Sequence, residues 1–101
     1  MGATVADNRS EHRYEVSLDG EGVGFTLYRS RPGLIAFVHT EVAERHEGEG
    51  LGSTLIGGAL DDVRARGLAV LPFCPFVNAY IERHPNYVEL VPTQYRAEFG
   101  L

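Results

Sequence analysis

The chain has no lysine, no tryptophan and a single cysteine, Cys74. One cysteine excludes an internal disulfide and any metal site that needs several cysteine ligands. Without lysine, all nine basic residues are arginines, and they are scattered along a chain whose net charge is −5. This distribution offers no basic stripe and argues against nucleic acid as a partner.

Long apolar runs are also absent from the sequence. No run approaches the ~20 residues that span a bilayer, so we expect no membrane partner. The polar first residues lack the apolar core of a signal peptide, and a lone thiol suits a reducing compartment, so we expect a cytoplasmic protein. The 101 residues, 44% of them hydrophobic, suffice for one compact domain. We predict a flexible arm over residues 1–11, a single domain over residues 12–101, and a monomer or weak dimer.

Alternating apolar and polar residues predict two strands, over residues 13–18 and 23–29, joined by the turn sequence DGEG. Residues 34–42 begin apolar on both faces, which predicts a central strand. Residues 68–74 predict a fourth strand, and residues 87–91 are read as a further strand in the tail.

Two helices are predicted from the second half of the sequence. In the first, apolar residues recur every four positions, at Leu51, Leu55, Ala59 and Val63. Gly67 ends this helix, and a shorter helix over residues 75–84 has Pro75 in its first turn. The order β-β-β-α-β-α predicts an α+β fold with a mixed, mostly antiparallel sheet, whose right-handed crossover places the fourth strand parallel to the third.

A glycine-rich loop separates the third strand from the first helix. Gly48, Gly50 and Gly52 would let the backbone approach an anion, and the amides of the first helical turn would point at a phosphate. A nucleotide P-loop needs a lysine, which this chain lacks, and a dinucleotide loop follows the first strand of a parallel sheet. A turn with no ligand is the alternative interpretation.

The strand, the loop GEGLGS, the amphipathic helix and the segment CPFVNAYIERHP resemble the very small, single-domain GCN5-related N-acetyltransferases over residues 13–90. The resemblance implies that loop amides hold the pyrophosphate of acetyl-CoA, with Gly50 and Gly52 as the matched glycines. Glu47 stands where the family has arginine or glutamine, and Arg45 could supply the charge instead. The resemblance implies that acetyl-CoA is bound by Thr40, Val42, Glu47, Gly48, Glu49, Gly50, Leu51, Gly52, Ser53, Cys74, Asn78, Tyr80 and Arg83.

The same resemblance implies a V-shaped splay between the third and fourth strands, which admits the pantetheine arm. Pro72 is an independent reason to expect it, because proline cannot donate a hydrogen bond to the sheet. An ordinary sheet edge at Pro72 is the alternative.

Three residues are candidates for catalysis. Cys74 precedes Pro75 and falls near a helix N-terminus, where amide dipoles favour a thiolate, and the resemblance implies an acyl-accepting nucleophile there. His39 could be a general base for an amine or for Cys74. Tyr80 matches the tyrosine that protonates the departing CoA thiolate in larger members of the family. The alternatives are an inert buried cysteine, a core histidine and a core aromatic residue.

These observations predict an enzyme that transfers an acetyl group from acetyl-CoA to an amine, either by direct attack or through acetylated Cys74. A non-catalytic module that binds CoA or acyl-CoA is the alternative, because only DGEG connects the first two predicted strands and leaves little to build an acceptor pocket.

Overall fold

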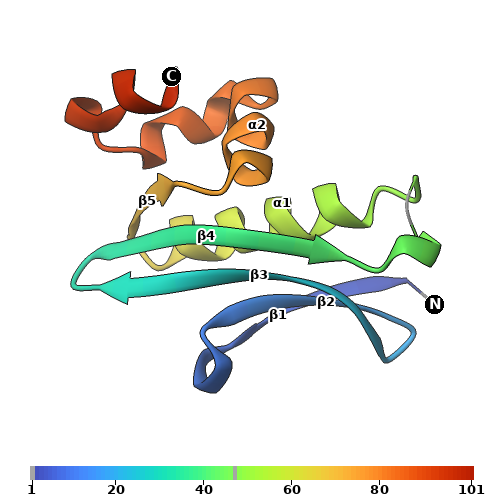
Figure 1. Cartoon of the computed structure of the whole chain (residues 1–101). Coiled ribbons are helices and arrows are strands. Elements are labelled where there is room, and N and C mark those ends of the chain that lie inside the picture. The colour runs from blue at the N-terminus through green and yellow to red at the C-terminus, as the bar shows by residue number, and fades with distance from the viewer. Residues whose placement is uncertain (1, 47) are drawn as a thin grey trace.

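The computed structural model describes residues 2–46 and 48–101. Its centre is one five-stranded sheet in which the strands lie side by side in the order of the chain (Figure 1). The strands are β1 (Ala3–Asn8), β2 (Arg13–Leu18), β3 (Glu21–Arg31), β4 (Leu34–Val42) and β5 (Ala69–Pro72). The helices are α1 (Leu51–Ala65) and α2 (Pro75–Arg83), followed by short 3₁₀ segments, of which the first is Pro85–Leu90. None of the helices in the described part is long and apolar enough to cross a bilayer.

The sheet confirms the predicted α+β class. Strands β1 to β4 pair antiparallel in succession, and β5, which follows α1, pairs parallel with β4. The pairing of β4 with β5 ends at Phe37 and Pro72, although β4 continues to Val42. The second half of β4 therefore separates from β5, and this is the splay that Pro72 predicts.

A bulge in β4 lies directly beside this separation. Leu27 of β3 pairs with His39 and Tyr28 pairs with Phe37, so Val38 is an extra residue without an opposite partner. Phe37 is buried, whereas Val38 and His39 are both exposed. The extra residue shifts the alternation by one position, so that Thr40, and not His39, continues the face that packs against the helices.

The prediction of a flexible arm over residues 1–11 is corrected by the structure. Residues 3–8 form β1 and pair along their whole length with β2. A Cβ atom on Gly58 of α1 would lie only 2.9 Å from Val5, so β1 packs closely on the helix. The sequence does not predict this strand because its alternating residues are small, so the apolar–polar alternation that indicates a strand is weak.

The predicted strand over residues 87–91 is also wrong, because these residues follow Pro85 into the 3₁₀ segment Pro85–Leu90. This tail is fixed to α1 through Tyr87, whose hydroxyl donates a hydrogen bond to Asp61 Oδ1 at 2.6 Å. Tyr87 is buried, and its ring completes the core beneath α2.

Both α-helices lie on one face of the sheet, and the core fills the space between. Two sheet tyrosines extend through this core and are anchored at their hydroxyls. Tyr14 donates to Asp62 Oδ2 of α1, and Tyr28 donates to Asp7 Oδ1 of β1, each at 2.6 Å. Burial, followed by the hydrogen bond to a carboxylate, favours the neutral phenol in both cases, so the pKa of Tyr14 is raised and the pKa of Tyr28 is raised to about 12.

These tyrosines predict a loss of stability in alkali. The hydrogen bond to Asp61, together with burial, raises the pKa of Tyr87 from 10.0 to about 12. Its contribution is complete below pH 10 and disappears as the pH rises towards 12, because the unfolded chain releases the phenolic proton first. The urea midpoint should fall across this range, and Tyr87→Phe should reduce the slope. Tyr95→Phe, at an exposed tyrosine, is the control, and an equal effect of both variants would contradict the prediction.

Candidate functional site

The glycine loop enters α1 through backbone conformations that favour glycine. Gly48 and Gly50 have φ angles of +85° and +76°, and Gly50 is the N-cap of α1. No side chain caps the helix, so the amides at its start keep their hydrogens available to an anion. The loop borders a pocket of about 230 Å³, lined by Val42, His46, Gly48, Gly50, Leu51, Gly52, Ser53 and Phe76.

Phe76 forms the wall of this pocket opposite the loop. A Cβ atom on Gly52 would lie 2.6 Å from its ring, so Gly52 lets α1 and α2 approach each other here. Gly48 and Gly50 are open, since nothing within 4 Å would touch a Cβ atom there. The loop is thus enclosed by an aromatic ring at Gly52 and accessible at the two preceding glycines.

Arg45 does not supply its positive charge to the loop, as the sequence suggested it could. Arg45 forms an ion pair with Glu21, so its guanidinium is directed to a carboxylate of β3. Glu49 lies 3.1 Å from His46 Nδ1. Glu47, the departure from the family pattern, lies outside the described residues.

Cys74 is held between the separating strands. It is the N-cap of α2, as predicted, and its amide donates a hydrogen bond to the carbonyl of Phe37 at 2.9 Å. Its side chain is only 4% exposed. Thr40, two residues before Val42 of the loop pocket, places its hydroxyl 3.3 Å from Cys74 Sγ. The inward face of β4 therefore leads from the glycine loop to the thiol.

The thiol is the end of a chain of hydroxyl groups. Thr26, fully buried in β3, lies 2.9 Å from Thr40 Oγ1 and donates to the carbonyl of His39. Because each hydroxyl carries one hydrogen, Thr40 then donates to Thr26 and accepts from the Cys74 thiol. A thiolate would reverse the chain, with Thr26 donating to Thr40 and Thr40 donating to the sulfur. Both protonation states of Cys74 can therefore be hydrogen bonded.

His39 is not brought to Cys74. Its side chain is 53% exposed on the face of the sheet that the helices leave bare. Its Nε2 lies 2.8 Å from Glu41 Oε2, and its ring centroid lies 6.4 Å from that of Phe25. Only its backbone carbonyl belongs to the hydroxyl chain, so the bulge excludes His39 as a direct base for Cys74.

Tyr80 lies between the two helices, outside the loop pocket. A Cβ atom on Gly57 would meet its hydroxyl at 2.7 Å, and its ring stacks on His84 with centroids 4.0 Å apart. Burial and the charge of Asp61 raise the pKa of Tyr80, and the charge of Arg83 opposes this. The hydroxyl makes no hydrogen bond to another described residue. Arg83 itself is exposed in the last turn of α2, roughly 13 Å along the helix from Cys74.

Asn78 carries an unused acceptor. Its Nδ2 donates to the carbonyl of Phe99 at 2.9 Å, which fixes the orientation of the amide. Its Oδ1 is buried and has no hydrogen-bond partner among the described residues. A buried oxygen without a donor is costly in a folded protein, so this atom is suited to accept from a bound ligand.

The structure thus groups the loop glycines with Val42, and Cys74 with Thr40, but leaves His39 and Arg83 apart. Sequence reasoning missed Thr26 and Phe76. Threonine in a strand has no distinguishing pattern, whereas Phe76 is an apolar residue in the first turn of a helix whose apolar stripe lies elsewhere. Among the described residues, no group of three histidine, cysteine or acidic side chains could hold a metal ion.

Known proteins similar to this chain in sequence or in structure are acetyltransferases of one family. The family model described as GCN5-related N-acetyl-transferase matches residues 13–90. A GCN5-like protein from Staphylococcus aureus has a solution structure that matches with a TM-score of 0.67 and 19% identity, over 88% of this chain and 87% of that one. A search of curated proteins gives no match.

Larger enzymes share the same fold. A ribosomal-protein alanine N-acetyltransferase from Escherichia coli matches with a TM-score of 0.54 and 19% identity, over 57% of this chain and 38% of that one. Its counterpart from Brucella melitensis matches with a TM-score of 0.50 and 21% identity, over 80% of this chain and 63% of that one. This chain therefore covers less than two thirds of either larger enzyme.

The hydroxyl chain predicts how the thiol reacts. Thr40→Val keeps the side-chain shape but removes the hydrogen bond that a thiolate would accept, and such bonds to charged groups contribute about 1.5–3 kcal/mol. Alkylation of Cys74 by iodoacetamide should therefore slow about tenfold. Thr54→Val, at an exposed threonine of α1, should leave the rate unchanged. Equal rates in Thr40→Val and the native protein would show that Thr40 does not support the thiolate.

Proposed function

Because the chain belongs to the GCN5-related N-acetyltransferase family, we propose that it transfers the acetyl group of acetyl-CoA to an amine by way of Cys74. The observation that carries this proposal is the position of Cys74 at the separation of β4 and β5, beside Thr40 and on the face that leads to the glycine loop.

The residues present fit acetyl-CoA. The uncapped amides of α1, with Gly48 and Gly50 open beside them, would hold the diphosphate. The buried Oδ1 of Asn78 would accept from an amide of the pantetheine arm, and Val42 and Thr40 would line that arm. Acetyl-CoA supplies a thioester, a carbonyl activated for attack by a nucleophile.

The first step belongs to Cys74. Its sulfur attacks the thioester carbonyl carbon, a new sulfur–carbon bond forms, and the original carbon–sulfur bond breaks with its electron pair on the departing sulfur. The thiol proton ends on that sulfur, so the charges balance. Burial and the charge of Asp61 raise the pKa of Tyr80 above that of an ordinary phenol, which makes it a weaker acid. As donor to the departing sulfur, Tyr80 would therefore give up its own proton and take up the thiol proton in exchange.

The second step returns Cys74 to its starting state. The amine attacks the acetyl carbon, a carbon–nitrogen bond forms, the bond to Sγ breaks, and one amine proton passes to a base. His39 would accept it from an amine that reaches the acetyl group past the edge of β4 left open beyond Phe37, because the ring is exposed on the bare face of that segment and oriented by Glu41. His39 thus retains the role of base towards the amine.

Binding is the first test. A ligand at 100 times its dissociation constant adds about 2.7 kcal/mol of stability, so acetyl-CoA should raise the melting temperature. Gly50→Asp should abolish this rise, because it places a carboxylate and a strained φ angle at the anion site. Gly33→Asp is the matched control, since Gly33 has φ +72° in an open turn far along β4 from the loop. Loss of the rise in both variants, or in neither, would remove the loop from the binding site.

The covalent route is tested by mass spectrometry of the protein after incubation with acetyl-CoA. We expect one acetyl group on Cys74, removed when an amine is added. Cys74→Ser should still show the rise in melting temperature but lose most of the turnover, because the hydroxyl is a far weaker nucleophile. Transfer that persists in Cys74→Ala would leave direct attack by the amine, with His39 as base. Binding without transfer to any amine would favour a CoA-binding module.

A further inference from the structure

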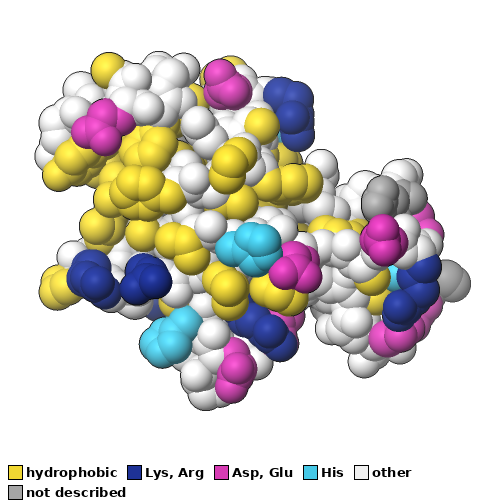
Figure 2. Space-filling model, viewed as in Figure 1, with side chains coloured by type: hydrophobic (Ala, Val, Ile, Leu, Met, Phe, Trp, Pro, Cys, Tyr) yellow, Lys and Arg dark blue, Asp and Glu magenta, His cyan; other side chains and the backbone are white. Residues whose placement is uncertain are grey.

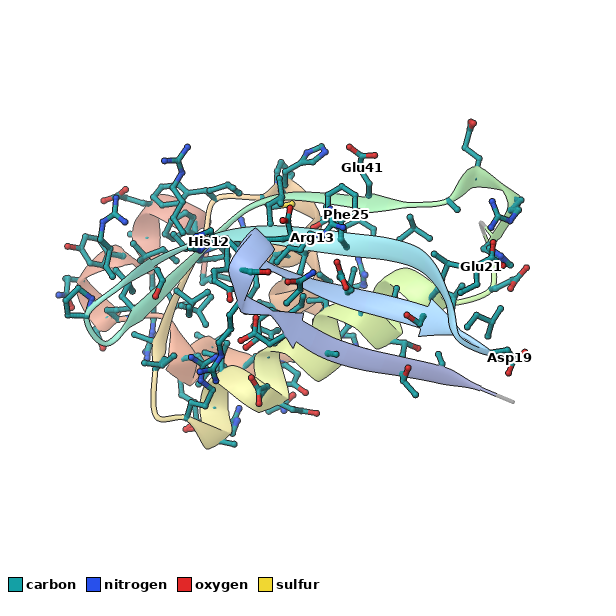
Figure 3. The ribbon with its side chains drawn as sticks, turned by 90° about the horizontal axis from the view of Figure 1, so that it is seen from below. His12, Arg13, Asp19, Glu21, Phe25 and Glu41 are labelled. Carbon is teal, nitrogen blue, oxygen red and sulfur yellow. The ribbon has the colours of Figure 1, made fainter. Side chains whose placement is uncertain are left out.

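The face of the sheet opposite the α-helices carries a second pocket. Figure 3 looks onto this face, on which Arg13, Phe25 and Glu41 stand on neighbouring strands and His12 lies at the start of β2. The pocket has a volume of about 390 Å³ and is larger than the one at the glycine loop. We call it the arginine pocket, after Arg29 and Arg31, which line it together with His12, Leu27 and Val38.

The arginine pocket is basic without compensation. No acidic residue lines it. Five other arginines of the chain are paired with carboxylates: Arg9, Arg13, Arg45, Arg64 and Arg66. Neither Arg29 nor Arg31 has such a partner among the described residues. Figure 2 shows basic side chains at the left of the molecule, where the turn between β3 and β4 lies in Figure 1.

Arg83 and Arg96 also lack a carboxylate partner among the described residues, but only Arg29 and Arg31 lie two positions apart on one strand and line the same pocket. They repel each other, and that repulsion is relieved when an anion binds between them. Guanidinium groups also match carboxylate and phosphate oxygens in geometry.

The pocket also has an apolar floor. Leu27 is half-buried in β3, and Val38, the extra residue of the bulge, is 37% exposed. A purely inorganic anion would leave this floor in water, whereas an organic anion with a short hydrocarbon segment would cover it. The lining therefore fits a small organic acid.

The position of the pocket connects it to the proposed reaction. Val38 follows Phe37, the last residue of β4 that pairs with β5. The edge of the arginine pocket at Val38 therefore lies on the bare face next to the point where the strands begin to separate, whereas the glycine loop and Cys74 lie on the helix side. His39, next to Val38, lies on the bare face between the pocket and Glu41.

We propose that the arginine pocket binds an acidic group of the acceptor, so that the preferred acceptor is a small amine that also carries a carboxylate or a phosphate. The role of this site in acceptor binding rests on the proposed acetyl transfer, whereas the binding of an acid there does not. The acid lies between Arg29 and Arg31, the hydrocarbon segment covers Leu27 and Val38, and the amine is directed to His39.

Binding is measured first, without acetyl-CoA, by titrating labelled protein with matched pairs of amines while recording backbone amide NMR spectra. The carboxylate pair is β-alanine against n-propylamine, and the phosphate pair is O-phosphoethanolamine against ethanolamine. We expect the acidic member of at least one pair to shift the signals of Arg29 and Arg31 at millimolar concentration. The two pairs distinguish a carboxylate site from a phosphate site.

Turnover is measured with the same amines in three proteins. The native protein should prefer the acidic amine about tenfold in kcat/KM, which corresponds to one charge-assisted hydrogen bond. The double variant Arg29→Gln/Arg31→Gln should lose this preference and keep the KM for acetyl-CoA. Arg64→Gln removes the same charge from α1, on the helix side, and should keep the preference.

The outcomes separate this inference from the proposed function. Absent or equal shifts at Arg29 and Arg31 with acidic and neutral amines would overturn the inference, whatever acetyl-CoA does. An equal loss of preference in Arg64→Gln would also overturn it, because the effect would then be one of overall charge. Failure of acetyl-CoA to raise the melting temperature would instead overturn the proposed function and leave the binding result standing.

Discussion

The early end of the parallel pairing between β4 and β5 is the constraint on which the rest of the site depends. Pro72 has no amide hydrogen to continue the ladder beyond Phe37. The next hydrogen bond to Phe37 comes from Cys74, at the point where the chain turns into α2. The same interruption therefore leaves the second half of β4 without β5 and fixes the only thiol beside it.

The bulge at Val38 decides what that half of β4 presents on each side. By adding one residue, it directs Thr40 and Val42 towards the helices and His39 and Glu41 towards the bare face. The inward side contains the thiol and its hydroxyl partners, and the outward side contains the ionisable pair. In the proposed transfer, acetyl-CoA would lie on the inward side and the amine would reach it from the bare face. Thr26 joins the two sides through the carbonyl of His39.

The sequence predicted the parts of this site that depend on local chemistry. Proline at position 72, Cys74 before Pro75, and the start of α1 at Leu51 each follow from the properties of a residue and its neighbours. The side on which His39 lies could not be predicted, because one extra residue reverses the faces of a strand and no sequence pattern shows which residue is extra. The strand β1 was missed because its small residues give a weak apolar alternation, and because the contact that packs it, between Val5 and Gly58, joins residues far apart in the chain.

The order of the strands has a consequence for how the molecule folds. Each of the first four strands pairs with its neighbour in the chain, so that part of the sheet has low contact order and can form as successive hairpins. The pairing of β4 with β5 closes only after α1 has bridged them, at a greater cost in loop entropy. The segment that carries Cys74 can therefore dock on β4 only once α1 has crossed the sheet. Docking of this segment is then the step that brings the thiol beside Thr40 and so completes the site.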